Sequence, residues 1–540
     1  MADVTHRARP RRALRRPTAV AVAALAAAAV SACGTTVRQT TTTTTGGAAV
    51  AQGDGLAAAP AATGPAAPAA AAAPGTVTGA ALPAAGTTTG TTATSPVGGT
   101  TTTTGTTTTG ATTTGGPHAG TGPKTAAAAI PAKGQGWDAK TVSVGITTEN
   151  DVSGALSAAG VALSPGNVEG DAQAIVDAIN REGGLYGRQV KLVKYDVNTT
   201  AATTNADSVA SQACATFTQD NTVIGVVNMT TAIDTATFRS CMAQHHTTIF
   251  SGSVAPLVNA DFAKYKPWLY AALNLPYERI TPVLIARLKA QGYFTGWSTL
   301  SGGPSPSTPV KVGVIYQSTD ISATTAKDGL LAALKAQGVA TDSFGFTSGS
   351  DFAAAELRFA GDGVTHVMQL DSGLLGFMIS ANAQHYYPRY GLTTLNAIDP
   401  FLAGNAPKQQ LNGAIGIGWL PALDVEAPAD PGMVSPGETK CLSDLAKGGQ
   451  TFSSSRFAEV VGLAMCDAFT IMRTGALAGG SLDQTALHNG INAQGSKIQQ
   501  ATTFVNGLTP ATPWIPGGAR DIGYENGCSC FRYHGSTYGF

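Results

Sequence analysis

Short polar side chains follow the carboxyl ends of several predicted strands. Hydroxyl and carboxylate groups of this kind can hydrogen-bond a polar or zwitterionic small molecule. The candidate ligand-binding residues are Thr147, Thr230, Thr231, Ser251, Ser253, Ser318, Asp320, Asp371 and Asp399. The alternative is that they cap helices, because Ser, Thr and Asp accept the free N–H groups at the start of any helix. The residue types alone leave both interpretations open.

No catalytic or metal-binding motif accompanies these residues. The globular part of the sequence has no G-x-S-x-G, no H-E-x-x-H and no phosphate-binding loop. His245 and His246 lie near a predicted helix end, which favours a solvated terminus over a metal site. Asp207, Asp220 and Asp234 lie on separate helices or loops, and we expect no acid/base pair among them. The sequence therefore predicts a binding protein that is not an enzyme and has no metal and no cofactor.

The candidates depend on strands and helices that alternate after Lys140. β-Branched runs predict strands at 142–146, 190–195, 222–227, 248–250, 311–316, 365–370 and 414–419, with a further strand end at 396–398. Helices are predicted between them at 170–181, 326–337 and 377–384. This alternation is typical of an α/β protein with parallel sheets covered on both faces. In such sheets ligands collect outside the carboxyl ends of the strands.

The first 32 residues form an export signal. Six Arg precede an unbroken apolar run at 19–30, which is too short to span a bilayer. Val30-Ser31-Ala32-Cys33 resembles the lipobox of bacterial lipoproteins, which implies cleavage before Cys33 and a lipid on its sulfur. The alternatives are a simple cleaved signal, in which Cys33 is incidental, and a twin-arginine signal at Arg11-Arg12. We expect the mature protein to be anchored through Cys33 to the outer face of the cytoplasmic membrane.

A Thr-, Ala-, Gly- and Pro-rich segment follows Cys33 and ends near residue 136. Its only charged side chains after Cys33 are Arg38, Asp54, Lys124 and Lys133, so it cannot build a core. We expect a disordered tether of about 100 residues with a typical end-to-end distance of roughly 50–60 Å. The remainder, 137–540, is long enough for two lobes of ordinary domain size.

The charge balance argues against nucleic acid as a partner. The chain of 540 residues has 33 Lys+Arg and 33 Asp+Glu. Without the first 32 residues, 27 basic and 32 acidic side chains remain, a net charge of −5. Binding to phosphate backbones needs gathered Lys and Arg, and the sequence has no basic cluster in this part.

Six cysteines remain besides Cys33, which favours disulfides in an exported protein. Cys214 and Cys241 lie in successive predicted helices, and Cys441 and Cys466 lie in another helix pair, so local bridges are expected. Cys528 and Cys530 are two residues apart. On a strand their Cα atoms would lie near the upper limit for a disulfide, so their pairing stays open.

One segment carries a family resemblance. The run Ile179-Asn180-Arg181-Glu182-Gly183-Gly184-Leu185-Tyr186-Gly187-Arg188-Gln189-Val190, leading to Tyr195-Asp196, resembles the segment after the first helix in type I periplasmic binding proteins of the leucine/isoleucine/valine-binding group. The ending Cys528-Ser529-Cys530-Phe531-Arg532-Tyr533 resembles actinobacterial substrate-binding lipoproteins of this group. The glycines of the first run suit a helix end and turn, where positive φ is often required.

The resemblance implies two Rossmann-like lobes with parallel central sheets, joined by three hinge crossings near Ala272, at 419–420 and at 521–524. The first lobe is then 137–272 with 421–520, and the second is 273–420 with 521–540.

The resemblance also implies that a small-molecule ligand is trapped between the lobes and delivered to the permease subunits of an ABC importer. Asp399 lies about where the family places a Glu that pairs with a ligand ammonium. Three family pocket positions hold Met229, Ala255 and Ile321 here, so the pocket class is implied and the ligand is left open among amino acids, amides and similar molecules. The alternative function is a ligand-sensing surface receptor of the same fold that is not coupled to transport.

Overall fold

The computed structural model describes residues 130–149, 163–426, 435–452 and 456–540. The chain divides into two units, residues 1–123 and 124–540, of which the second is compact. The expected signal segment, the lipid site at Cys33 and most of the expected tether lie outside the described residues. The described strands and helices all belong to the second unit.

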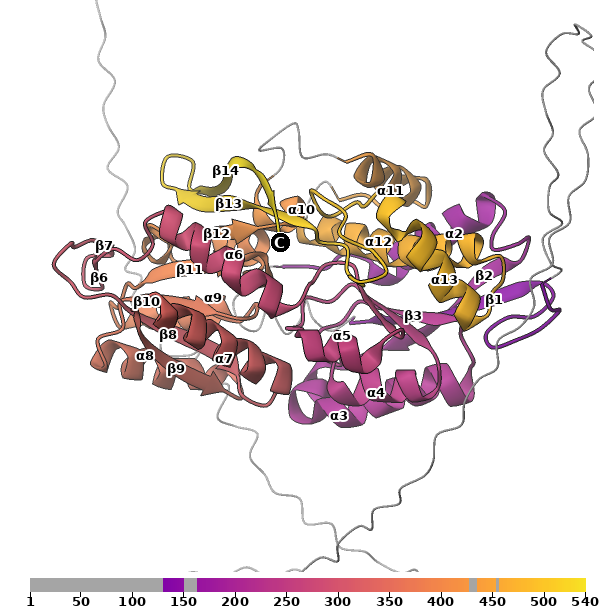
Figure 1. Cartoon of the computed structure of the whole chain (residues 1–540), viewed down its shortest axis with the longest axis horizontal. Helices are drawn as coiled ribbons and strands as arrows, with labels where there is room; N and C mark the ends of the chain where they lie inside the picture. The colour runs from indigo at the N-terminus through magenta and orange to yellow at the C-terminus, as the bar shows by residue number, and fades with distance from the viewer. Residues whose placement is uncertain (1–129, 150–162, 427–434, 453–455) are drawn as a thin grey trace, which may run out of the picture. The chain divides into compact units, whose positions relative to one another are not determined.

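A five-stranded parallel sheet, in the order β2-β1-β3-β4-β5, forms the core of the first lobe. Its strands are β1 (Thr141–Thr148), β2 (Gln189–Asp196), β3 (Gly225–Asn228), β4 (Thr248–Ser251) and β5 (Leu269–Ala271). Its helices are α2 (Val168–Arg181), α3 (Thr199–Ala215), α4 (Ala236–Gln244), α5 (Asn259–Tyr265), α11 (Pro436–Lys447), α12 (Arg456–Gly479) and α13 (Gln484–Gln494). Figure 1 shows α2, α12 and α13 on one side of this sheet and α3 and α4 on the other. Every residue of β3 and β4 is buried, as expected for central parallel strands.

A seven-stranded sheet, in the order β14-β13-β12-β11-β10-β8-β9, forms the core of the second lobe. Its strands are β8 (Lys311–Gln317), β9 (Ala340–Phe346), β10 (His366–Gln369), β11 (Arg389–Thr393), β12 (Ile415–Gly418), β13 (Gly518–Glu525) and β14 (Cys530–Gly539). Its helices are α6 (Tyr277–Ala290), α7 (Ile321–Ala336), α8 (Phe352–Gly361) and α9 (Leu374–Ala383), and β6 (Trp297–Ser298) and β7 (Gly303–Pro304) form a separate small ribbon. Strands β8 to β12 are parallel to one another. Strand β13 is antiparallel to both β12 and β14, which the expectation of parallel sheets did not include.

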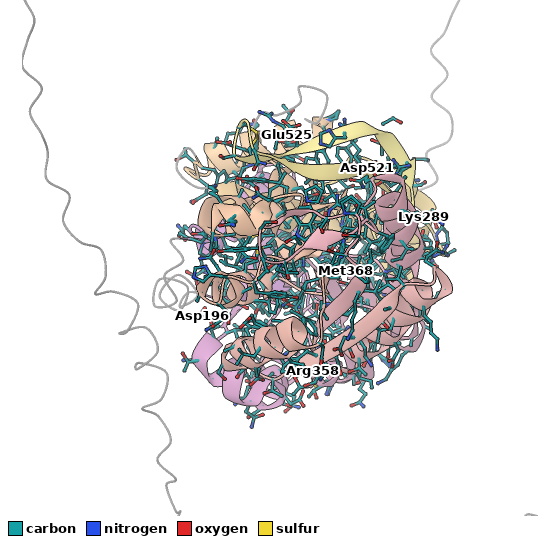
Figure 2. All side chains as sticks on the ribbon, turned by 90° about the vertical axis from the view of Figure 1, so that its left-hand side faces the viewer. Asp196, Lys289, Arg358, Met368, Asp521 and Glu525 are labelled. Carbon is teal, nitrogen blue, oxygen red and sulfur yellow. A yellow bond between two sulfur atoms is a disulfide. The ribbon has the colours of Figure 1, made fainter. Side chains whose placement is uncertain are left out.

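Burial in the second lobe follows its layers. Figure 2 shows Met368 of β10 in the interior of the lobe, whereas Lys289, Arg358 and Glu525 lie at its edges. Met368 is 2% exposed. The core therefore lies between the sheet and its helices, and these three charged side chains lie at the solvent boundary.

The chain crosses between the two sheets three times, and the crossing segments are bonded to one another. The first crossing follows Ala271, which exchanges backbone hydrogen bonds with Pro513 and Ile515 of the third crossing. The second follows β12, where Trp419 Nε1 donates to Leu273 O at 2.9 Å. The chain joins the seven-stranded sheet at Gly518, three residues before the expected boundary. These contacts tie the hinge strands into one band.

The two ends of helix α2 are determined by particular residues of the sequence. Asn167 caps α2 by accepting from Gly170 N at 3.0 Å, and the helix ends at Arg181. Gly183, Gly184 and Gly187 then have φ of +98°, +66° and +77°. At Gly184 an added Cβ would lie 2.0 Å from Arg188 O, so only glycine fits this turn.

Helix α12 is long and apolar enough to cross a membrane by length and composition. Most of its residues are buried, and it packs on β3, β4, α2 and α13. The same composition is typical of the core helix of a globular lobe. The helix is therefore a central element of the first lobe.

All six cysteines outside the signal region are paired in the structure. Cys214 is joined to Cys241, Cys441 to Cys466 and Cys528 to Cys530. The premise that Cys528 and Cys530 share one strand is wrong. Cys528 lies in the turn before β14, and Ser529 has φ +54°, which brings the two Cα atoms to 5.2 Å.

One predicted strand end is also misplaced. Residues 396–398 do not end a strand, because β11 ends at Thr393 and a 3₁₀ turn follows at Thr394–Asn396. Ala397 then takes a left-handed conformation with φ +51°. Asp399 lies in the π-helical segment Ile398–Ala403.

Candidate functional site

The strand order of each sheet marks where a crevice can form. In the first sheet β1 lies between β2 and β3, and in the second β8 lies between β9 and β10. The connections leave in opposite directions from these neighbouring strands, and in open α/β sheets this is where a ligand crevice is expected. In the first lobe Thr147 lies next to the last residue of β1. In the second lobe Asp320 follows β8 and Asp371 follows β10.

The carboxyl ends of β1 and β3 share a buried hydrogen-bond pair. Thr147 Oγ1 donates to Asn228 Oδ1 at 2.7 Å and accepts from Met229 N at 3.0 Å. Thr147 and Asn228 are both fully buried. Asn228 Nδ2 is buried and has no hydrogen-bond partner within the described residues. An unpaired donor is thus left at the switch point of the first sheet.

Two predicted hydroxyl groups converge on a carboxylate that follows β3. Asp234 Oδ2 accepts from Ser251 Oγ at 3.0 Å and from Ser253 Oγ at 2.5 Å. Thr230 is buried as well, but its hydroxyl accepts from Ala232 N at 3.1 Å within the same loop. The structure therefore brings Ser251 and Ser253 together and gives Thr230 a local role in the turn.

A buried arginine holds this carboxylate and a second one. Arg239 of α4 is 2% exposed, and its Nε and Nη1 atoms lie 3.6 Å from Asp234 Oδ1 and Asp261 Oδ1. Burial disfavours the charged guanidinium, but the two carboxylates outweigh it and raise the pKa of Arg239. The cation therefore stays charged and fixes the loops that follow β3 and β4.

The network continues into the second lobe. Asp261 Oδ2 of α5 accepts from Ser322 Oγ of α7 at 2.8 Å, so one hydrogen bond joins the two lobes. Asp320 caps α7 by accepting from Ser322 N at 2.7 Å. Burial raises the pKa of Asp320, while the two capping N–H groups and Arg239 oppose the rise. In the structure Asp320 therefore acts as the N-cap of α7, which is the alternative that the sequence had left open for this residue.

Asp371 is the acidic group at the switch point of the second sheet. Its Oδ1 atom accepts from Gln369 Nε2 at 2.6 Å and from Gly373 N at 2.8 Å. Its Oδ2 atom is buried without a partner within the described chain. Burial raises its pKa, the two hydrogen bonds oppose this, and nearby Asp320 adds to the rise. A cation or a donor placed beside Oδ2 would stabilise the ionised form.

Asn396 fixes the backbone around Asp371. Its Nδ2 atom donates to Gln369 O at 2.9 Å and to Asp371 O at 2.8 Å. Tyr277 at the start of α6 donates to Leu370 O. Two elements that are distant in sequence, the 3₁₀ turn with Asn396 and helix α6 with Tyr277, therefore hold the loop after β10 in place.

Three predicted residues lie apart from this cluster. Thr231 is exposed, and Ser318 is exposed with its hydroxyl donating to Phe346 O at 3.1 Å. Asp399 is partly exposed, and burial raises its pKa to about 6 although Arg456 of the first lobe opposes the rise. The charged groups that act on Asp399 are thus Arg456 and Glu426, both of the protein itself.

Several central residues were missed from the sequence. Asp234 was considered only as an acid without a pair, yet it binds both serines and Arg239. It lies in the loop after β3, four residues beyond Thr230, and extending the search along that loop would have included it. Arg239 and Asp261 had no such signal, because each belongs to a helix and meets the others only in the fold.

Comparisons with known proteins support the fold. No protein-family model matches the sequence, and no curated protein matches it either. Solved structures do match. A branched-chain amino acid ABC transporter protein from Thermus thermophilus with bound valine is 12% identical with a TM-score of 0.52, covering 74% of this chain and 96% of that one.

Two further solved structures give the same result. A fatty acid ABC transporter substrate-binding protein from Thermomonospora curvata is 12% identical with a TM-score of 0.51, covering 76% of this chain and 95% of that one. A solute-binding protein from R. palustris in complex with 4-hydroxybenzoate is 13% identical with a TM-score of 0.50, covering 74% and 97%. At this level of identity the likeness shows the fold and leaves the ligand open.

Proposed function

The chain has the α/β fold of the type I periplasmic binding proteins, and we propose that it is an extracytoplasmic solute-binding lipoprotein. It captures a small polar ligand, such as an amino acid or an amide, between the two lobes and delivers it to the permease subunits of an ABC importer. The structures that it resembles are named as substrate-binding proteins for amino acids, fatty acids or 4-hydroxybenzoate, which supports binding rather than catalysis.

One observation carries the proposal. Both switch points hold a buried polar atom without a partner in the described residues: Asn228 Nδ2 in the first lobe and Asp371 Oδ2 in the second. Buried polar groups are normally paired, so unpaired ones at a crevice mark places for ligand groups. A ligand with an acceptor at one end and a donor or cation at the other satisfies both. We favour Asp371 over Asp399 as the cation partner, because Arg456 already acts on Asp399.

Ligand binding in this scheme favours contact between the lobes. Only a ligand that binds the closed arrangement better than the open one can shift the equilibrium between them. The Asp261–Ser322 hydrogen bond adds to that difference, because it joins α5 of one lobe to α7 of the other. The crevice residues and the interlobe bond would then act together.

A thermal-unfolding screen of the unit 124–540 tests the binding role. A ligand at 100 times its Kd adds about 2.7 kcal/mol to the free energy of unfolding. The screen covers amino acids, amides, aromatic acids and sugars. If no class raises the unfolding temperature, capture of these solutes is refuted.

A matched pair of variants then tests the site. Asp371→Asn should weaken binding of a cationic or zwitterionic ligand roughly 10- to 150-fold, because a charge-assisted hydrogen bond contributes about 1.5–3 kcal/mol. Asp328→Asn removes an exposed acid of the same lobe and serves as the control. Equal affinity in both variants would place the ligand elsewhere.

Membrane anchoring needs its own test. Replacing Cys33 with Ser removes the proposed lipid site. We expect the variant protein to leave the membrane fraction and appear in the medium. A variant that stays on the membrane to the same extent would refute lipidation at Cys33.

A further inference from the structure

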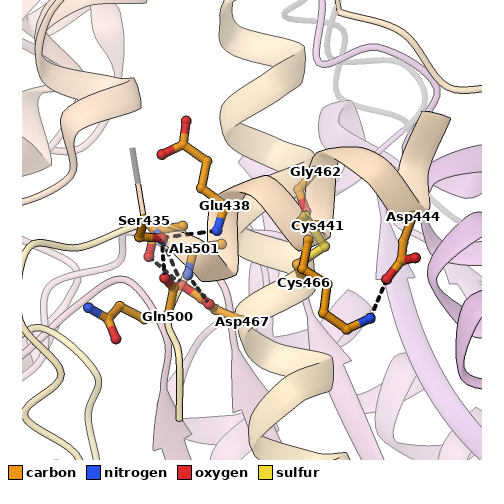
Figure 3. The surroundings of a disulfide bond; sticks show 11 residues. Ser435, Glu438, Cys441, Asp444, Gly462, Cys466, Asp467, Gln500 and Ala501 are labelled. Carbon is orange, nitrogen blue, oxygen red and sulfur yellow. Dashed lines mark hydrogen bonds and ion pairs between the residues drawn. A yellow bond between two sulfur atoms is a disulfide. The ribbon is translucent and has the colours of Figure 1, made fainter. Parts of the chain in front are cut away.

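A cavity of about 620 Å³ lies in the first lobe between α2, α11, α12 and the short helix Gly495–Lys497. Its volume is within the range of small-molecule sites. None of the nine predicted ligand residues lines it. Figure 3 shows part of its wall, where the Cys441–Cys466 disulfide fastens α11 to α12. The walls are therefore held together by a covalent bond.

The cavity offers an apolar surface to a ligand. Its lining includes Ile175 and Ile179 of α2, Phe469 and Leu477 of α12, and Ile498. Leu477 is 42% exposed, so part of its apolar surface is open to a ligand. An apolar ligand body would cover this surface and gain hydrophobic free energy.

Among the charged side chains that line the cavity, Glu182 pairs with two cations, Lys440 and Arg473. Glu182 binds Lys440 Nζ at 2.8 Å and Arg473 Nη1 at 2.5 Å, and Lys440 also contacts Asp444 at 2.6 Å. Arg473 Nε is buried and has no hydrogen-bond partner in the part of the chain that the structure describes. Lys497 also lines the cavity and is exposed.

The third acid of the lining is already satisfied. Asp467 accepts from Ala501 N at 2.7 Å, from Thr502 N at 3.0 Å and from Thr502 Oγ1 at 2.6 Å. Figure 3 shows Asp467 directed toward this backbone segment. Among the charged side chains of the lining, the hydrogen-bonding capacity that remains is thus that of donors on Arg473 and Lys497. This arrangement favours an anion over a cation.

We propose that this cavity is a second ligand site, separate from the crevice, and that it binds a small carboxylic acid with an apolar body. The carboxylate lies at Arg473 and Lys497, and the body lies on the isoleucines of α2 and on Phe469. Within the described residues no group of three His, Cys, Asp or Glu side chains is placed to hold a metal ion. In this proposal the acid binds by charge at Arg473 and Lys497 and by apolar contact with the lining.

The test uses the full-length chain and two probes of the same shape. These are 3-phenylpropionate and its neutral amide, 3-phenylpropanamide, titrated by calorimetry at neutral pH. We expect the acid to bind at least roughly tenfold more tightly than the amide, since a hydrogen bond to a charged group contributes about 1.5 kcal/mol or more. Equal affinity for the two probes, or no binding of the acid at millimolar concentration, would overturn the proposal.

Three variants locate the probe. Arg473→Gln should weaken binding of the acid roughly tenfold, whereas Lys447→Gln, which removes a cation that pairs with Asp444 outside the cavity, should leave it within about twofold. Thr470→Trp fills the cavity from a half-exposed position and should abolish binding of both probes. Unchanged affinity in Thr470→Trp would place the probe elsewhere and refute the site. Lys497→Gln, at an exposed position, replaces Arg473→Gln if that variant does not fold.

Discussion

Replacing Asp171 with Asn should stabilise the protein at neutral and alkaline pH. Asp171 lies in the first turn of α2 and is fully buried. Both of its carboxylate oxygens are buried without a hydrogen-bond partner in the described residues. Burial raises its pKa from 3.8 to about 7. The folded state therefore holds a proton that the unfolded state releases.

The size of the effect follows from this gap between the two pKa values. Below about pH 4 both states bind the proton, and the group contributes its full stability. Between about pH 4 and pH 7 only the folded state binds it, so the free energy of unfolding falls by about 1.4 kcal/mol per pH unit. Above pH 7 both states are ionised and the loss is complete, at about 4 kcal/mol. Asn carries no proton, so the variant lacks this loss.

Urea unfolding of the wild type and of Asp171→Asn at pH 5, 6, 7 and 8 measures the effect. The variant should gain about 3 kcal/mol over the wild type between pH 5 and pH 7, and the gain should level off above that. Asp177→Asn, on the same helix with its carboxylate bonded to Gln173 at 2.8 Å, controls for the loss of one negative charge on α2. A difference between Asp171→Asn and the wild type that does not change with pH would refute the reasoning.

Three further predictions concern the lobe contact and the core. Ser322→Ala removes the hydrogen bond to Asp261 and should weaken ligand binding, measured by calorimetry, roughly tenfold. The control Thr325→Ala, on the exposed side of the same helix, should leave the affinity unchanged. Equal affinities of the two variants would exclude a role for this bond in closure of the lobes. Asp467→Ala leaves the N–H groups of residues 501 and 502 unpaired and should cost about 2–5 kcal/mol in urea unfolding; a loss below about 1 kcal/mol would contradict the contacts. Denatured but unreduced protein should show no alkylation at the six paired cysteines, and full alkylation after reduction; labelling before reduction would contradict the bridges.

The alternation of strands and helices was predictable because each element carries its own pattern. Residues 142–146 are buried at every position except Ser143, as in a parallel strand covered on both faces, and the structure extends this strand to Thr141–Thr148. The β11 strand was missed, although it is buried along most of its length. Its sequence Arg-Tyr-Gly-Leu-Thr contains a glycine and follows two tyrosines, so its apolar run is short. The segment at 396–398 looked more like a strand end, but its polar first residue is used to bond the loop after β10.

The candidate site was predictable only where it lies at strand ends. Ser251 is the last residue of β4 and Ser253 lies two residues beyond it, so the rule for parallel sheets places both at the crevice edge. Arg239 lies in the middle of α4, and nothing in its local sequence distinguishes a buried cation from a solvated one. Its role depends on two carboxylates that are 5 and 22 residues away along the chain. Such contacts arise from tertiary packing and leave no periodic signal.

Unpaired polar atoms at the proposed crevice lower the free energy of unfolding and can raise the affinity for a ligand. A buried polar group without a partner costs about 1–3 kcal/mol, and Asn228 and Asp371 each contribute one such atom. A ligand that supplies both partners removes this cost when it binds, so the free energy withheld from folding appears as affinity. The unpaired donor and acceptor therefore argue for a ligand that bridges the two lobes, and they specify its polarity at each end.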